Sequence, residues 1–311
     1  MKLYLAHPTH SRKKVRELEL KIEEKFGIEL VNPFYDINAK EVSFVDKGEW
    51  NPFDIRVPVS VVDTDINGID ECNGVLAIID NNIAMGLFME IFYAKEHYKP
   101  VIAICTNQKL QTHPWLRYCA DKIFCSYNEF EEYWFNQKSY DIKIAICGEK
   151  RHGKDVIAKY LVDNYGFKQF AFADEIKRTI KNIYGFSYNR IENKDNYMRS
   201  LLQKTGDNLR QNNKEIFINS LFLKINNYQY VLPAEYSKIV ISDVRLLREA
   251  QEVERNGFKI WKIKRDILES NDGHQTETEV KQIVPYLIIY NNKTIESLYE
   301  TVDKLIKEKR V

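Results

Sequence analysis

The sequence has few cysteines, almost no net charge and no long apolar run, and each shortage excludes a class of protein. Its five cysteines form no Cys-x-x-Cys pair and its six histidines follow no metal-ligand spacing, so we expect neither a disulfide framework nor structural zinc. A formal net charge of +1 provides no basic field for polymeric nucleic acid. The longest apolar runs fall far short of the ~20 residues of a membrane span. We therefore expect a cytoplasmic protein without membrane contact.

The composition that remains is typical of a globular protein with two domains. The 311 residues exceed the usual size of a single core, and 44% are hydrophobic against 29% charged. Short apolar segments alternate with amphipathic ones, which indicates α/β architecture with parallel sheets covered by helices on both faces. A short polar stretch at 136–141 divides the chain, so we predict domains over residues 1–138 and 139–311.

Apolar periodicity predicts five strands in each half of the chain. The predicted strands cover residues 2–6, 28–33, 74–79, 100–105, 122–125, 142–147, 169–173, 238–242, 259–264 and 286–290. Helices are expected over 11–26, 129–135 and 156–164, with a largely helical stretch at 177–229. The first of these helices ends on Gly27, a natural residue for a helix C-terminus. The polar stretch 36–54 fits neither period and is expected to form a loop.

The second half contains a glycine-rich segment of the kind that holds phosphates. Gly148 and Gly153 flank four residues between a predicted strand and a predicted helix, and Lys154 and Asp155 follow. Backbone amides and a helix N-terminus attract phosphate oxygens, and Lys154 would reach the outer phosphates. Asp155 replaces the usual Ser or Thr, so a carboxylate would bind Mg²⁺ directly or through water. An ordinary glycine-containing turn is the alternative.

A strand that ends in a carboxylate provides a second candidate metal ligand. Asp243 closes the apolar segment 239–243, where an acid can lie beside a nucleotide-bound Mg²⁺. A strand-ending aspartate also often just caps the next helix, and that alternative stays open.

Further motifs follow these in order through the second half. They comprise Phe170–Lys177, Leu202–Arg210, Asp243-Val-Arg245 with Glu249, and His274–Glu277. Their order and spacing over about residues 142–311 resemble the phage deoxynucleoside monophosphate kinase family. The resemblance implies a P-loop α/β domain that transfers the γ-phosphoryl group of ATP, with Mg²⁺, to a deoxynucleoside monophosphate.

The resemblance also assigns roles to residues in this half. It implies that Asp174 lies near the acceptor nucleotide, and that Gln203, Arg210 and Arg245 contact the acceptor or its phosphates. Surface or structural ion pairs are the alternative roles for the two arginines. If the protein is phage-encoded, its location would be the host cytoplasm.

In the first half, one acidic residue lies in unusually apolar surroundings. Glu90 follows a predicted strand and falls early in the apolar segment Met85–Ala94. If it faced the sheet it would be desolvated beside any ligand at the strand ends. Ser11 and Arg12 open the first helix, where amides and cationic side chains could receive a 5′-phosphate. A solvent-exposed position for Glu90 and a solvated basic helix face are the alternatives.

Several separated elements of residues 1–135 resemble the nucleoside 2-deoxyribosyltransferase family. They are Tyr4, the segment Asp65-Ile-Asn-Gly68, and Gly86-x-x-x-Glu90 with its following tyrosine. The likeness implies a flavodoxin-like domain without a cofactor, in which Glu90 is the nucleophile on the deoxyribose C1′. It further implies that Tyr4 orients Glu90, that Asp65 contacts the sugar or protonates the leaving base, and that Gly86 lies at the substrate.

The first half also departs from that family's pattern. Ala84 stands where a second acid is frequent, and Asn73 replaces a frequent aspartate. Base protonation then lacks an obvious donor, so either Asp65 does more or the preferred base needs less help. The family's shared sites imply a homo-oligomer formed through the first domain.

Together the two resemblances predict a bifunctional enzyme acting on deoxynucleotides and free nucleobases. One domain would exchange the base of a 2′-deoxynucleoside or its monophosphate, and the other would phosphorylate a monophosphate, as suits a phage that makes modified DNA. An N-glycosidase fused to the kinase is one alternative. A nucleotide-sensing protein with one inactive domain is the other.

Overall fold

The computed structural model describes residues 1–37, 56–81, 84–136, 141–193, 195–266 and 275–308. The chain forms two compact units, residues 1–138 with 226–234, and residues 139–225 with 235–311. Segment 226–234 thus belongs with the first unit, although it falls within the second of the two domains predicted from the sequence. The predicted boundary at 138/139 lies outside the described residues and stays a prediction, as does most of the expected loop at 36–54.

The first unit is built on a five-stranded sheet in which each neighbouring pair is parallel. Its order is β2-β1-β3-β4-β5, the flavodoxin-like arrangement. The strands are β1 (Lys2–Ala6), β2 (Glu29–Val31), β3 (Gly74–Ile79), β4 (Val101–Cys105) and β5 (Lys122–Phe124). This order confirms the fold predicted for the first half.

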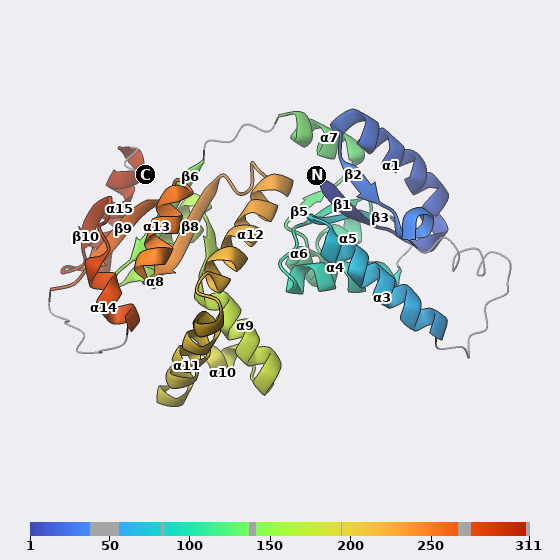
Figure 1. The fold of residues 1–311 in the computed structure, drawn as a ribbon. Helices are drawn as coiled ribbons and strands as arrows, with labels where there is room; N and C mark the ends of the chain where they lie inside the picture. Colours follow the sequence, from blue (N-terminus) through green and yellow to red (C-terminus); the bar gives the residue numbers. More distant parts are fainter. Residues whose placement is uncertain (38–55, 82–83, 137–140, 194, 267–274, 309–311) are drawn as a thin grey trace. The chain divides into compact units, whose positions relative to one another are not determined.

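Helices cover both faces of this sheet. The helices are α1 (Arg12–Phe26), α3 (Arg56–Glu71), α4 (Met85–Glu96), α5 (Gln108–Gln111), α6 (Pro114–Cys119) and α7 (Tyr127–Phe135), with short helical turns at Thr9–Ser11 and Pro33–Ile37. As Figure 1 shows, α1 and α7 lie on one face, and α3 and α4 lie on the other. Helix α1 ends at Gly27 in the left-handed conformation, as the sequence predicts.

The second unit has its own five-stranded parallel sheet, in the order β10-β9-β6-β8-β7. Its strands are β6 (Ile142–Cys147), β7 (Lys168–Phe170), β8 (Lys238–Val244), β9 (Lys259–Lys264) and β10 (Leu287–Tyr290). The central strand β6 is directly followed by the glycine-rich segment. The α/β architecture predicted for this half is confirmed.

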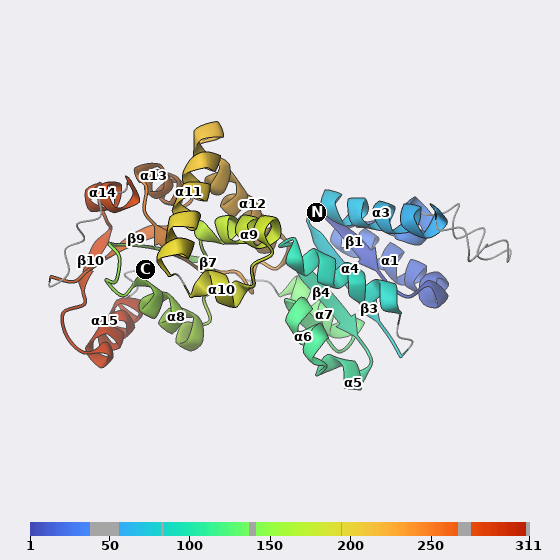
Figure 2. The same cartoon turned by 90° about the horizontal axis from the view of Figure 1, so that it is seen from below.

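Eight helices among the described residues belong wholly or mainly to the second unit. They are α8 (Lys154–Tyr165), α9 (Ala173–Tyr184), α10 (Tyr188–Glu192), α11 (Asn196–Asn212), α12 (Ile216–Val231), α13 (Leu247–Arg255), α14 (Gln275–Gln282) and α15 (Ile295–Lys307). Figure 2 shows α8 and α15 on one face of the sheet and α13 on the other. Within the described part of the chain, no helix has the length and hydropathy needed to span a membrane.

Candidate active sites

The first unit brings Tyr4, Asp65 and Glu90 together on one face of its sheet. Tyr4 lies on β1 and is fully buried, while Asp65 and Glu90 come from α3 and α4. The Tyr4 hydroxyl donates a hydrogen bond to Glu90 Oε1 over 3.2 Å, and it is also hydrogen-bonded to Asp65. Glu90 Oε2 is buried without a hydrogen-bond partner. A buried polar atom without a partner is uncommon in proteins, which makes Glu90 a candidate for a functional role.

The helical period explains why Glu90 faces inward. On α4 the buried residues are Leu87, Ile91 and Ala94, and Glu90 lies three residues after the first and four before the last. Residues at these spacings share one face of a helix. Glu90 therefore lies on the same face of α4 as these buried apolar residues, and its carboxyl group points towards the sheet.

Burial dominates the electrostatics of this group. Desolvation raises the pKa of Glu90 to about 8, the nearby carboxylate of Asp65 adds to the increase, and the Tyr4 hydrogen bond opposes it. Burial and the same two carboxylates also raise the pKa of Tyr4, which keeps its proton. At neutral pH Glu90 is therefore protonated, and a group with such a perturbed pKa is a candidate for a catalytic role.

The start of α4 leaves room next to this group. Gly86 is exposed, and a methyl group added to it would meet nothing within 4 Å. Ala84 precedes the helix and provides no side-chain cap. The structure therefore places Gly86 one turn before Glu90, and the substrate contact assigned to it stays a prediction.

Ser11, predicted to receive a phosphate, already has an acidic partner. Its hydroxyl donates to Asp80 Oδ2 over 2.6 Å, and His10 Nε2 lies 3.9 Å from the other oxygen of that carboxylate. Arg12 donates to the backbone oxygen of Thr9 at 3.1 Å. A carboxylate of the protein thus lies where an anionic ligand was expected, and sequence reasoning missed Asp80. The phosphate role of Ser11 and Arg12 stays a prediction.

In the second unit, two positions of the phosphate loop accept only glycine without strain. Gly148 has φ +144°, and a Cβ there would lie 2.5 Å from the backbone oxygen of Ile263. Gly153 has φ +99°, and a Cβ there would collide with the Asn291 side chain. The loop backbone therefore runs closely over β9 and leads directly into α8, which begins at Lys154.

Lys154 is buried at the start of α8, and its ammonium group donates to the backbone oxygen of Glu149 over 2.7 Å. Burial, followed by the positive charge of Arg245, lowers the pKa of Lys154 to about 8. The carboxylates of Asp155, Glu277 and Asp243 oppose that decrease. The loop lysine is therefore surrounded by one cation and three acids, as expected of a site that receives a charged ligand.

Glu277 joins this loop to Arg245. It is buried in the first turn of α14, and its Oε1 pairs with the Arg245 guanidinium group. Its Oε2 accepts from the backbone N–H of Lys150 in the loop at 3.2 Å. The sequence showed Glu277 only as the last residue of a motif, because its two partners lie 32 and 127 residues away.

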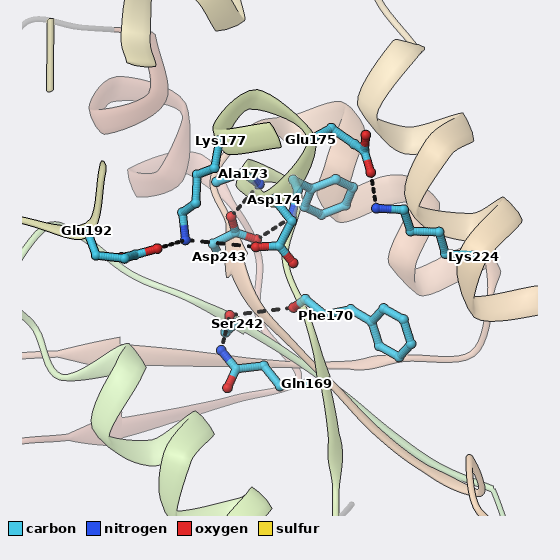
Figure 3. Close-up of polar contacts among 11 residues, drawn as sticks. Gln169, Phe170, Ala173, Asp174, Glu175, Lys177, Glu192, Lys224, Ser242 and Asp243 are labelled. Atoms are coloured by element: carbon cyan, nitrogen blue, oxygen red, sulfur yellow. Dashed lines mark hydrogen bonds and ion pairs between the residues drawn. The ribbon is translucent and has the colours of Figure 1, made fainter. Parts of the chain in front are cut away.

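The Asp243 carboxylate binds backbone N–H groups at the start of α9, as Figure 3 shows. Its carboxylate accepts from the backbone N–H groups of Phe172 and Ala173 at 2.8 and 2.9 Å. Asp243 therefore caps a helix that precedes it in the chain, whereas the sequence left open the capping of the next helix, α13. Its assignment as a Mg²⁺ ligand stays a prediction.

Asp174 follows in the same turn, within a network of charged side chains. Burial and the neighbouring Asp243 raise its pKa to about 6, while Lys177 and Lys224 oppose the increase. Lys177 lies 3.8 Å from Asp174 Oδ1, and Lys224 pairs with the adjacent Glu175 (Figure 3). Lys224 comes from α12, so two helices beyond the loop converge on this aspartate.

The two remaining predicted contacts lie on α11. Gln203 is half-buried there. The Arg210 guanidinium group lies 3.3 Å from Asp207 and 5.0 Å over the ring of Phe217. These contacts give Arg210 the structural role held open above. The substrate roles of Gln203 and Arg210 stay predictions.

The donor set near Lys154 fits Mg²⁺. This ion is usually bound through one or two carboxylates together with phosphate oxygens and water. Asp155 is exposed in the first turn of α8, and Asp243 lies close enough to act on the charge of Lys154. Among the residues that the structure describes, no group of three acidic, His or Cys side chains could hold a metal without such a substrate.

Two solved structures were compared with the chain. The 2-deoxyribosyltransferase of Bacillus psychrosaccharolyticus is 18% identical with a TM-score of 0.35, and the match covers 44% of this chain and 93% of that one. The S. aureus MnaA–UDP complex is 10% identical with a TM-score of 0.23, covering 99% of this chain and 88% of that one. At these TM-scores neither likeness bears on function.

The sequence comparisons concern the second half. A protein of Acanthamoeba polyphaga mimivirus, provisionally named deoxynucleotide monophosphate kinase, is 29% identical over 181 residues, which cover 52% of this chain and 94% of that protein. The family model described as deoxynucleotide monophosphate kinase matches residues 143–198 and 188–302. These two ranges together cover just over half of the chain. The chain therefore belongs to the deoxynucleotide monophosphate kinase family.

Proposed function

We propose that the protein is a bifunctional enzyme that phosphorylates a deoxynucleoside monophosphate and transfers a 2-deoxyribosyl group between nucleobases. Family membership supports the first activity. The second rests on one observation, namely a buried glutamate oxygen without a partner beside a tyrosine and a second carboxyl group. The two reactions would take place in different units of the chain.

Phosphorylation would depend on positioning and on charge. The strained glycines shape a loop whose amides receive phosphate oxygens, and Lys154 neutralises charge that develops during transfer. Arg245 lies close enough to lower the pKa of Lys154, so both cations would face the same phosphates. No covalent nucleophile is required, because the acceptor phosphate attacks directly.

ATP is the phosphoryl donor that we propose, with Mg²⁺ bound by Asp155 and Asp243. When bound, the metal would neutralise phosphate charge and orient the transferred group. The acceptor would lie on the side of Asp174, where Lys177 and Lys224 converge from α9 and α12. Gln203 and Arg210 remain candidates for contacts with that nucleotide.

Glycosyl transfer would proceed by two displacements at C1′ of the deoxyribose. An oxygen of the Glu90 carboxylate attacks C1′, the base leaves with the electron pair of the C1′–N bond, and a second base then displaces the carboxylate. Two inversions give overall retention of configuration. Tyr4 holds one carboxyl oxygen, so Oε2, which has no partner, is our candidate for the attacking atom.

Incubation with deoxynucleotides tests both activities at once. The purified chain is mixed with each 2′-deoxynucleoside or its 5′-monophosphate and an isotope-labelled free base, with and without ATP and Mg²⁺, and the products are identified by mass spectrometry. We expect a base-exchanged product without ATP and a diphosphate only with ATP. Free deoxyribose or its 5-phosphate as the product would instead support a hydrolase, and unchanged mixtures would contradict both activities and support a sensor.

The pairing of the two activities suggests a role in the synthesis of modified DNA. A phage that replaces a base would need first a deoxynucleotide with the new base and then its phosphorylation. We further propose that the protein has this role, that it is located in the cytoplasm, and that it forms a homo-oligomer through the first unit. Size measurement in solution tests the last of these.

A further inference from the structure

The proposed transferase site leaves one requirement unmet, the proton for the departing base. A purine or pyrimidine leaves readily only if a proton reaches it as the C1′–N bond breaks. Ala84 provides no acidic side chain. The proposed nucleophile, Glu90, is itself protonated at neutral pH, because burial raises its pKa to about 8. Glu90 must therefore lose a proton at the same stage at which the base must gain one.

The hydrogen bonds of Tyr4 connect these two needs. Its hydroxyl contacts Glu90 Oε1 at 3.2 Å, and it is hydrogen-bonded to Asp65 as well. A tyrosine hydroxyl has a single proton to donate, whereas an ionised carboxylate can only accept. Both hydrogen bonds can exist together only if one of the two carboxyl groups carries a proton and donates it to the Tyr4 oxygen. The three groups thus share two protons.

We propose that Tyr4 relays a proton from Glu90 to Asp65, which turns Asp65 into the acid that protonates the leaving base. This inference rests on the proposed glycosyl transfer. The donation from Tyr4 to Glu90 Oε1 belongs to the ionised glutamate. While Glu90 is protonated the same bond runs from Glu90 to the Tyr4 oxygen, and the Tyr4 hydroxyl donates to Asp65 instead. The Glu90 O–H bond then breaks as its proton passes to the Tyr4 oxygen, and the original Tyr4 proton passes to the Asp65 carboxylate. Glu90 is then ionised and Asp65 is neutral, and no proton has come from solvent.

The later steps balance in the same way. Glu90 forms its bond to C1′ while the base nitrogen takes the electron pair of the breaking bond together with the Asp65 proton. The incoming base then attacks C1′, gives its proton to Asp65 and releases Glu90 as a carboxylate. After the product leaves, the relay runs backwards and restores the starting state.

The full burial of Tyr4 favours a relay over exchange with water. Tyr4 is never left as a phenolate, because it takes up the Glu90 proton as it gives up its own, and burial and the two carboxylates raise its pKa. The group therefore passes protons without changing its own charge. Asp65 then acts as the proton donor without the second acid that is frequent in the family pattern.

A pair of donor substrates that differ by one methyl group tests the relay. The base of 2′-deoxyguanosine must be protonated as it leaves, whereas 7-methyl-2′-deoxyguanosine already carries the positive charge and releases a neutral base. For Tyr4→Phe we expect kcat with 2′-deoxyguanosine to fall by about 10²–10⁴-fold, the usual size of general acid catalysis. With the methylated donor the decrease should be less than about tenfold.

Matched variants separate this role from a structural one. Asp65→Asn should show the same selective loss as Tyr4→Phe, and Glu90→Ala should lose turnover of both donors. Thermal unfolding of each variant checks that the first unit is folded. Equal losses on the two donors in folded Tyr4→Phe would show that the tyrosine only orients Glu90, and would overturn the relay. If the unaltered chain turns over neither donor, the glycosyl-transfer proposal itself fails.

The pH dependence gives a second readout, which a purely structural role would not produce. The relay needs one proton shared by Glu90 and Asp65, so kcat/KM with 2′-deoxyguanosine should fall as the pH rises through about 8. In Tyr4→Phe this decline should disappear, because the proton of Glu90 can no longer reach Asp65. A decline that persists unchanged in the folded variant would contradict the relay.

Discussion

The candidate site of each unit buries an ionisable group whose pKa is about 8, Lys154 in the second unit and Glu90 in the first, and the cost of burial is compensated differently in the two. Lys154 in the second unit donates to a backbone oxygen and has three carboxylates nearby. Glu90 in the first unit has one hydroxyl donor, one neighbouring carboxyl group and one oxygen with no partner. The charge of Lys154 is thus largely compensated by groups of the protein itself, whereas the carboxyl group of Glu90 is only partly compensated. The following experiments test or refine that contrast.

The largest effects should come from removing each group in turn. Lys154→Ala should reduce phosphorylation on the order of 10³-fold or more, because a buried cation aimed at transferred phosphate is lost. Glu90→Ala should reduce base exchange at least as much, because the covalent step is lost. Both rates are measured on both variants, and each variant serves as the control for the other. Loss of both activities from either substitution would contradict independent sites.

A smaller effect is expected from Glu277, which compensates charge without touching the proposed substrates. Glu277→Gln keeps an acceptor for the Lys150 N–H but removes the negative charge beside Arg245 and Lys154. We expect kcat/KM for phosphorylation to fall about tenfold, the factor that corresponds to ~1.4 kcal/mol.

The pH profile of the same variant gives the sign of the effect. A lysine is active while charged, and Lys154 loses its charge as the pH rises through about 8, so phosphorylation should decline above that pH. The carboxylate of Glu277 opposes the decrease in the pKa of Lys154, so its loss should move the decline to lower pH. An unchanged profile would show that the ion pair is only structural. Glu279→Gln, a neighbouring substitution on the same helix, is the control.

Stability changes at glycine should also differ between the units. Gly148→Ala places a methyl group against the backbone of β9 at a positive φ, and should destabilise the second unit by about 1–3 kcal/mol. Gly86→Ala adds a methyl group in open space on a helix, and should be neutral or stabilise the first unit by up to ~1 kcal/mol. Chemical denaturation measures both. Equal effects would mean that the phosphate loop tolerates relaxation at Gly148.

The smallest expected effect concerns the unpaired glutamate in the absence of substrate. The folded pKa of Glu90 is raised, so between about pH 4.5 and 8 the folded chain keeps a proton that the unfolded chain loses, and the free energy of unfolding falls as the pH rises. Glu90→Gln removes this penalty. We expect its Tm to exceed that of the unaltered chain at pH 8, and the difference to shrink as the pH is lowered. At pH 4 the two should coincide. A lower Tm for the variant at pH 8 would show that the carboxyl group stabilises the fold.

The parallel architecture could be predicted because central strands of such sheets are continuous apolar runs. The predicted bounds of β1, β3, β6 and β9 are those observed. The strand predicted at 169–173 ends earlier, at Phe170, because Asp243, some 70 residues away, accepts the backbone N–H groups of Phe172 and Ala173. Local pattern cannot reveal a cap supplied from another strand.

The same limit applied to the sites. The order of strand, glycines and lysine correctly predicted a loop that leads directly into a helix, and its phosphate binding stays a prediction. The apolar neighbours of Glu90 pointed to its burial. The partners of Ser11 and Arg245 were not foreseeable, because Asp80 and Glu277 reach them from other elements of the fold. Long-range pairing, rather than residue type, decides which charged groups remain available to a ligand.

The unpaired Oε2 of Glu90 also bears on how this sequence has been selected. A carboxyl group in this position lowers the stability of the empty protein, and one nucleotide change converts a glutamate codon into a glutamine codon of nearly the same shape. Selection for folding alone would favour that change, since stabilising substitutions are easily found. Folding stability therefore does not explain the glutamate at position 90. Its presence is expected if it has been retained for its function.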